Sequence, residues 1–202
     1  MPRSPARRRA APGRPRSQHA RRAVLNAARA LFADGGYPAA TIEAIARRAG
    51  VAKTTIYRWW PNRAALLVDV LVEEATAAVP LPHGRDPLRA LRAELRGGAA
   101  AANGLTGRLL TSLLGDAQQD AEVHSALLAG LFYPRREASV AAIRRAQASG
   151  AVRADVPPNI AVDLLFGPMF FRMFVRHEPP TKAFVQRAFG FILEGLRPPR
   201  RR

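Results

Sequence analysis

The chain has 202 residues with 32 Lys or Arg against 15 Asp or Glu, which gives a formal net charge of +17. Its 48% of apolar residues is enough for a buried core, so wholesale disorder is excluded, and the absence of cysteine excludes disulfides, thiolate metal sites and cysteine nucleophiles. No apolar run approaches the roughly 20 residues of a membrane-spanning helix, and no apolar stretch follows the basic amino terminus, so we expect a cytoplasmic protein without membrane insertion or a secretory signal.

The positive charge is concentrated in the first third of the chain. Residues 1–63 hold 14 basic and two acidic residues, whereas residues 64–202 hold 18 basic and 13 acidic ones. This asymmetry is typical of a module that binds a polyanion. Residues 1–16 mix Pro, Gly, Ala and Arg without apolar periodicity and indicate a disordered basic arm. Within it, Gly13-Arg14-Pro15-Arg16 resembles the core of an AT-hook that lies in the minor groove, although a flexible tail that attracts phosphates is the simpler interpretation.

Apolar residues recur with a helical period through most of the remaining chain, and no stretch alternates in the manner of a strand. Glycine and proline mark the helix ends, while Thr41 and Asn62 are expected caps. The sequence therefore predicts an all-α protein. Its expected helices cover about 17–33, 41–49, 53–59, 63–79, 87–102, 103–115, 120–132, 134–149, 158–175 and 181–196.

Residues 41–60 have the layout of a helix-turn-helix. Gly50 provides the tight turn, Val51 fills the corner, and Ile56 and Trp60 are expected to hold the second helix to the core. The polar side chains left facing outward on that short helix suit hydrogen bonding in a major groove, and they are Lys53, Thr54, Thr55, Tyr57 and Arg58. The alternative is a small three-helix domain whose polar face is incidental.

Residues 20–67 resemble the amino-terminal domain of the tetracycline-repressor (TetR) family of bacterial transcription regulators. The matching text is AARALFADGGYPAATIEAIARRAGVAKTTIYRWWPNRAAL, which agrees in the end of its first helix, the Thr before the second, the Ala-Gly-Val turn and the Tyr near the end of the third. The resemblance implies contacts at or near base edges for Lys53, Thr54 and Thr55, and phosphate contacts for Thr41, Tyr57, Arg58 and Arg63. The sequence departs from the family at Thr54, Arg63 and Ala64, where a small residue, a lysine and an acidic residue are common.

The last two predicted helices, 158–175 and 181–196, are the most apolar. The first is apolar nearly all round, so it must be buried on every side, with one face on its own domain and another on a partner subunit. In the second, the apolar stripe includes Phe184, Val185, Ala188, Phe189, Ile192 and Leu196. We therefore expect a homodimer through these two helices that reads double-stranded palindromic DNA; the alternative is the central helix of a monomeric bundle. The stretch AVDLLFGPMFFRMFV also resembles one group of carboxy-terminal domains of this family.

Gly167-Pro168 lies in the middle of helix 158–175, where proline removes a backbone hydrogen bond and predicts a kink. A kink beside Phe and Met side chains favours a cavity for a small apolar effector. The candidate wall residues, each of which would otherwise be ordinary core, are Leu109, Leu113, Phe132, Phe166, Met169 and Met173.

Catalysis finds little support in the sequence. The four histidines lie far apart without metal-ligand partners at i+3 or i+4, and there is no Gly-rich phosphate loop or nucleophile elbow, so we expect neither an enzyme nor a metal or cofactor. The favoured function is a repressor released from its operator by a small molecule, with helix 63–79 coupling the effector to the DNA. The alternatives are an architectural protein that coats DNA without an effector, and a ligand-carrier or enzyme-like domain with a tethered DNA reader. The predicted organisation is an arm over 1–16, a helix-turn-helix domain over 17–63, an effector-binding and dimerisation domain over 64–196, and a basic tail over 197–202.

Overall fold

The structure is a computed structural model that describes residues 14–198, and in this range it contains helices and no strands. Most of the expected basic arm and tail lies outside the described residues. The helices are α1 (Arg14–Ala39), α2 (Ile42–Ala49), α3 (Lys53–Tyr57), α4 (Arg63–Ala78), α5 (Pro87–Ala102), α6 (Leu105–Ala117), α7 (Ala121–Leu127), the π-helical turn η1 (Leu128–Phe132), α8 (Tyr133–Ala148), α9 (Pro158–Val175) and α10 (Lys182–Leu196). The all-α prediction is confirmed.

The first helix differs most from expectation. It begins at Arg14 and not near residue 17, so three residues assigned to the disordered arm are helical. Pro15 is accommodated there because the first amides of a helix have no intrahelical partner. The predicted break occurs at Gly36, whose φ of 68° and ψ of −162° are not helical, but a last helical stretch then continues to Ala39. Glycine suits this position because a side chain would strain a positive φ.

Three further boundaries are corrected by the structure. The third helix ends at Tyr57 and not at residue 59, and α6 covers Leu105–Ala117 in place of 103–115. The single helix expected over 120–132 is divided into α7 and the wider turn η1. In contrast, α9 runs through Pro168 without any interruption of its helical dihedral angles, so the expected kink does not break the helix.

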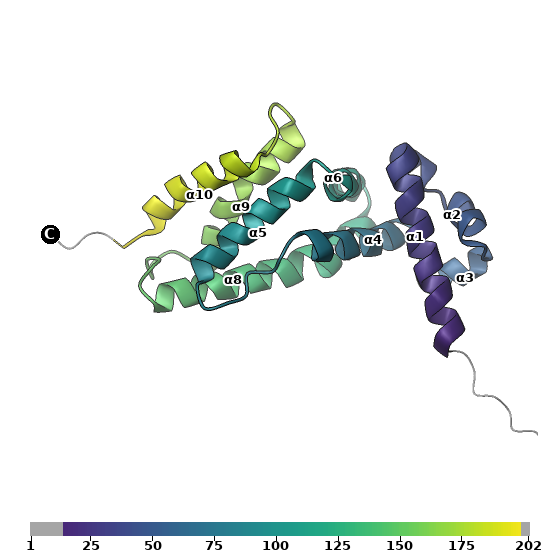
Figure 1. The fold of residues 1–202 in the computed structure, drawn as a ribbon, viewed down its shortest axis with the longest axis horizontal. Coiled ribbons are helices and arrows are strands. Elements are labelled where there is room, and N and C mark those ends of the chain that lie inside the picture. The colour runs from purple at the N-terminus through teal and green to yellow at the C-terminus, as the bar shows by residue number, and fades with distance from the viewer. Residues whose placement is uncertain (1–13, 199–202) are drawn as a thin grey trace, which may run out of the picture.

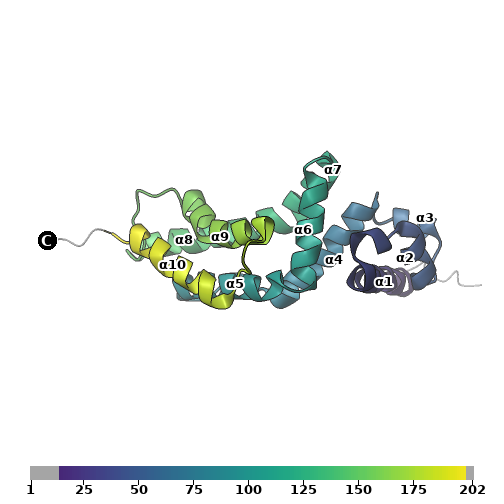
Figure 2. The ribbon, with the colours of Figure 1, turned by 90° about the horizontal axis from the view of Figure 1, so that it is seen from above.

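The molecule is elongated, with α1–α3 at one end and α5 and α8–α10 at the other (Figures 1 and 2). We call α1–α3 the head and α5–α10, with η1, the body. Helix α4 leads from the head into the body, and α6 and α7 lie between the two ends (Figure 2). One buried apolar cluster joins head, α4, α6 and α7, and a second joins α5, α8, α9 and α10.

Polar contacts fix the head on α4. The Asp69 carboxylate accepts hydrogen bonds from Arg21 Nη2 at 2.6 Å and from Trp60 Nε1 at 2.9 Å. Arg29 bridges from α1 to Glu73 and Glu74 on the next turn of α4. We call residues 53–60, which hold α3 and end at Trp60, the recognition segment. Because these bonds connect α1 and the end of this segment to one helix, the head and α4 should move together.

Candidate functional site

The turn between α2 and α3 is built by local capping. The Thr41 hydroxyl oxygen accepts the amide hydrogen of Ala44 at 3.2 Å, and Gly50 ends α2 in the left-handed conformation with φ of 66°. Its amide donates to the carbonyls of Ala46 and Arg47. Both caps agree with the sequence prediction, since capping depends on residues within one turn.

Of the five side chains predicted to face outward from the recognition segment, four are exposed, and all five lie around a buried anchor. Ile56 and Trp60 are buried, and the four most exposed side chains are Lys53, Thr54, Tyr57 and Arg58, while Thr55 is half-buried. Lys53 Nζ lies 3.0 Å from Glu43 Oε1, and this hydrogen bond lowers the pKa of Glu43. Because both groups are solvent-exposed, the ion pair is weak and a phosphate or base edge can replace it.

The two remaining DNA-binding candidates have other contacts in the unbound chain. Thr41 uses its oxygen as the α2 cap but retains a hydroxyl hydrogen to donate. The Arg63 guanidinium lies 3.9 Å from the centre of the Tyr37 ring. Burial, followed by the hydrogen bond with Asp116 of α6, raises the pKa of Tyr37. Arg63 therefore lies at a joint between head and body as well as at the start of α4.

A cavity of about 450 Å³ lies between α4, α5, α6, η1, α8 and α9. Its wall is mostly apolar, and four of the six candidate residues line it, namely Phe132, Phe166, Met169 and Met173. Leu109 and Leu113 do not. They are fully buried in the cluster shared with α4 and α7, because α6 presents another side to the cavity, where Thr106, Gly107 and Leu110 lie.

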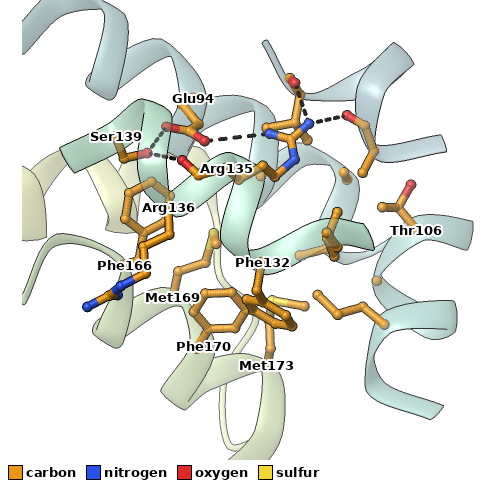
Figure 3. A pocket seen from close by; sticks show the side chains of 18 of the residues that line it. Glu94, Thr106, Phe132, Arg135, Arg136, Ser139, Phe166, Met169, Phe170 and Met173 are labelled. Carbon is orange, nitrogen blue, oxygen red and sulfur yellow. Dashed lines mark hydrogen bonds and ion pairs between the residues drawn. The ribbon is translucent and has the colours of Figure 1, made fainter. Parts of the chain in front are cut away.

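Several polar side chains interrupt the apolar wall (Figure 3), and the sequence did not indicate the three that form its buried end, Glu94, Arg135 and Ser139. Glu94 and Ser139 are 2% and 1% exposed, and the Ser139 hydroxyl donates to Glu94 Oε2 at 2.9 Å. Arg135 Nη1 lies 3.5 Å from Glu94 Oε1, and Arg135 Nη2 donates at 2.8 Å to the carbonyls of Ala75, in the last turn of α4, and of Val79, which follows it. A usable signal was an acidic residue on the apolar stripe of α5, between Leu91 and Leu95.

Burial raises the pKa of Glu94 from 4.5 to about 7, against the opposing effects of Ser139 and Arg135. The folded protein therefore binds a proton that the unfolded chain releases, and stability should fall as the pH rises from 4.5 to about 7. In the wild type this decrease in the free energy of unfolding should amount to up to about 3 kcal/mol. We expect Glu94→Gln, which has no proton to lose, not to show it. Urea unfolding at a series of pH values measures it. Glu137→Gln, an exposed carboxylate on α8, should retain the wild-type slope; equal slopes in all three proteins would contradict the prediction.

A second candidate surface is apolar and exposed. Ile160, Leu164, Gly167 and Phe171 follow one another at helical spacing along α9, and all are exposed. Phe191 of α10 is 73% exposed and lines a groove with Ile160 and Leu164. Of the apolar stripe predicted on α10, Val185, Phe189 and Leu196 are buried within the chain and the other three residues are half-buried.

Helix α9 is also long and apolar enough to cross a membrane, contrary to the expectation from sequence, because only Asp163 and Arg172 are charged. Length and composition alone are weak grounds, since core helices of soluble proteins meet the same criteria. Both charged residues form ion pairs within the chain, Asp163 with Arg136 and Arg172 with Glu178. One side of this helix is buried within the chain, whereas five large apolar side chains are exposed, namely Ile160, Leu164, Phe171, Phe174 and Val175.

Among the described residues, no group of three or more His, Cys, Asp or Glu is arranged to hold a metal ion.

Comparison with known proteins identifies two family models along the chain. Residues 24–70 match the model of bacterial regulatory proteins of the tetR family, and residues 81–191 match the tetracyclin repressor-like C-terminal domain. An uncharacterised HTH-type transcriptional regulator of Bacillus subtilis, YdeS, is 29% identical over 174 residues, which is 86% of this chain and 88% of the relative.

Solved structures show the same architecture. The TetR family regulator SCO0332 has 33% identity and a TM-score of 0.76, with 89% of this chain and 100% of that chain covered. Thermus thermophilus FadR, a TetR family repressor in complex with lauroyl-CoA, shares the fold with a TM-score of 0.66 and 22% identity over 90% of this chain and 98% of that chain. Regulators of this family bind DNA and function as dimers. The chain therefore belongs to the TetR family and is a DNA-binding transcriptional regulator.

Proposed function

We propose that two copies of this chain repress transcription from a palindromic operator and that a small apolar effector releases them. The observation that carries this proposal is the course of α4. This helix begins at Arg63 beside the recognition segment, and its last turn is held by Arg135 in the cavity wall. An effector that favours one position of α4 would change the spacing of the two heads and so lower the population that fits the operator.

The recognition segment would enter the major groove. Lys53, Thr54 and Thr55 are assigned to base edges, and Tyr57, Arg58, Thr41 and Arg63 to phosphates, on the family pattern together with their exposure around buried Ile56 and Trp60. To bind phosphate, Arg63 would leave the Tyr37 ring. We also propose that the DNA-binding domain ends near residue 63.

The dimer would form through α9 and α10. Their uncovered apolar residues, with Phe191 and Leu164 at the centre, give a face that needs a partner, and a second copy supplies an identical face on a twofold axis. Two heads on such an axis would read half-sites about one helical turn (~34 Å) or a multiple apart.

The effector would occupy the cavity between α4, α5, α6, α8 and α9. Its volume of about 450 Å³ lies within the range of small-molecule sites, and its wall is predominantly apolar. The complex of Thermus thermophilus FadR with lauroyl-CoA supports a lipid-like molecule in this architecture. We propose that the protein acts in the cytoplasm, where its DNA lies, and that it is a regulator without enzymatic activity.

Substitutions in the recognition segment test DNA reading. Tyr57→Phe and Arg58→Ala should weaken binding to every DNA, whereas Lys53→Ala and Thr55→Ala should also relax sequence preference, by about 1–3 kcal/mol per lost base contact. Fluorescence anisotropy on DNA from upstream of the gene, compared with scrambled DNA of equal length, measures both effects.

Arg85→Ala is the matched control, because it removes one exposed positive charge far from the recognition segment. Equal losses on both DNAs for all four variants would contradict the division of roles. Near-equal wild-type binding to the two DNAs, with a steep salt dependence, would instead favour the architectural DNA-coating function.

A further inference from the structure

The effector cavity has one polar end, and its composition restricts what can bind there. Four charged side chains line the cavity. Arg136 and Asp163 pair with each other, with side chains 38% and 59% exposed, so their charges compensate one another near the surface. Glu94 and Arg135 lie deeper and, with Ser139, form the buried polar end. A ligand that fills the apolar part therefore has one end beside Glu94, Arg135 and Ser139, where a polar group of the ligand can form hydrogen bonds.

Arg135 has an N–H donor that lacks a hydrogen-bond acceptor among the described residues. Its Nη2 is occupied by the carbonyls of Ala75 and Val79, but its buried Nη1 has no hydrogen-bond partner among the described residues, and the nearest anionic oxygen, on Glu94, is 3.5 Å away. A buried donor without an acceptor costs free energy, and a charged one costs more. A carboxylate is a strong acceptor for a guanidinium, because the hydrogen bond between them is charge-assisted.

Glu94 is able to give way to a second carboxylate. Its Oε2 accepts the hydrogen bond from Ser139, and burial raises its pKa to about 7, so little free energy is needed to protonate it near neutral pH. Once Glu94 is neutral, the charge of Arg135 is left uncompensated. An incoming monoanion then restores the balance, whereas a cationic group would add to the positive charge.

We propose that the cavity binds an elongated apolar carboxylic acid, whose carboxylate takes the place of the Glu94 charge beside Arg135. This inference rests on the proposed effector role of the cavity and names the chemistry of its ligand. If each non-hydrogen atom of a ligand takes roughly 30 Å³, the volume of one water molecule in the liquid, about 450 Å³ holds about fifteen such atoms, so an unbranched acid of medium length fits. Because Arg135 also holds the last turn of α4, a ligand on this guanidinium acts directly on the helix that carries the head.

The test compares three probes of equal chain length, namely decanoic acid, decan-1-ol and decylamine, on the full chain by isothermal titration calorimetry. We expect decanoate to bind about tenfold or more tightly than the alcohol, and the amine to bind most weakly. Arg135→Met should remove this preference with little change for the alcohol. Glu94→Gln should strengthen decanoate binding, because the competing charge is gone while Arg135 remains. Titrations near pH 8 in two buffers of different ionisation enthalpy should show uptake approaching one proton by the wild type and none by Glu94→Gln.

Equal binding of alcohol and acid, no binding of any probe, or weakening of decanoate by Glu94→Gln would overturn the inference. The Glu94 variant keeps Arg135 and its contacts to α4, so it tests the idea even if Arg135→Met is unstable. Anisotropy on operator DNA separates the inference from the proposed function: selective decanoate binding that leaves operator affinity unchanged would support carboxylate recognition and contradict effector release.

Discussion

Glutamate at the centre of the exposed α9–α10 face should reduce operator affinity by about a thousandfold or more. Leu164 and Phe191 are 48% and 73% exposed in the single chain and line one groove. In a dimer they would be buried against their copies, and a buried, unpaired carboxylate costs several kcal/mol. We expect Leu164→Glu with Phe191→Glu to give a folded monomer. A single head cannot read a palindrome, and specific sites are typically bound 10³-fold or more tightly than random DNA, so affinity should fall to the non-specific level.

Sedimentation equilibrium and anisotropy on operator DNA measure the two consequences together. Tyr133→Glu is the matched control, because Tyr133 is also a large exposed side chain but lies on α8, outside this face. It should leave both the dimer and the operator affinity unchanged. A double variant that remains dimeric and retains its affinity would place the dimer interface elsewhere.

Trp60→Ala should destabilise the head by about 3–5 kcal/mol, the usual cost of truncating a buried aromatic side chain. Trp60 is 3% exposed, donates from Nε1 to Asp69 at 2.9 Å, and has the Arg21 guanidinium 5.3 Å from its ring centre. The substitution removes the packing and leaves the Asp69 carboxylate short of one donor. Operator binding should fall with it, although no outward side chain of the recognition segment is changed.

The chain offers its own control and reporter for this prediction. It has two tryptophans, and both lie at the end of the recognition segment, so the fluorescence of the remaining one reports the unfolding of the head in either variant. Trp59 is only half-buried and packs edge-on against Trp60. Trp59→Ala should therefore cost clearly less in urea unfolding. Equal losses in the two variants would show that Trp60 is not the anchor of the segment.

The residues that cap helices were predictable because capping is local. Thr41, Gly50 and Asn62 act on backbone groups within three or four residues, so their roles in the structure follow from the text of the chain around them. The buried positions of Ile56 and Trp60 were predictable for a similar reason, since residues four apart share one helical face.

Local sequence patterns did not predict which side of a helix faces the cavity. On α6, Leu109 and Leu113 have the same apolar character as Leu110, but only Leu110 lines the cavity, because the rotation of α6 depends on how α4, α7 and α9 pack around it. On α10, the packing of α5 and α9 buries Phe189 and leaves Phe191 exposed.

By itself, the sequence determined the all-α class, the helix-turn-helix and its outward side chains, because each depends on spacing within a few turns. Only the tertiary structure brought Glu94 of α5 and Ser139 of α8, 45 residues apart, into one buried polar group with Arg135, and showed that this arginine also holds the end of α4. The physical reason is that periodicity shows which residues are buried, whereas the partner of a buried charge depends on how distant helices pack.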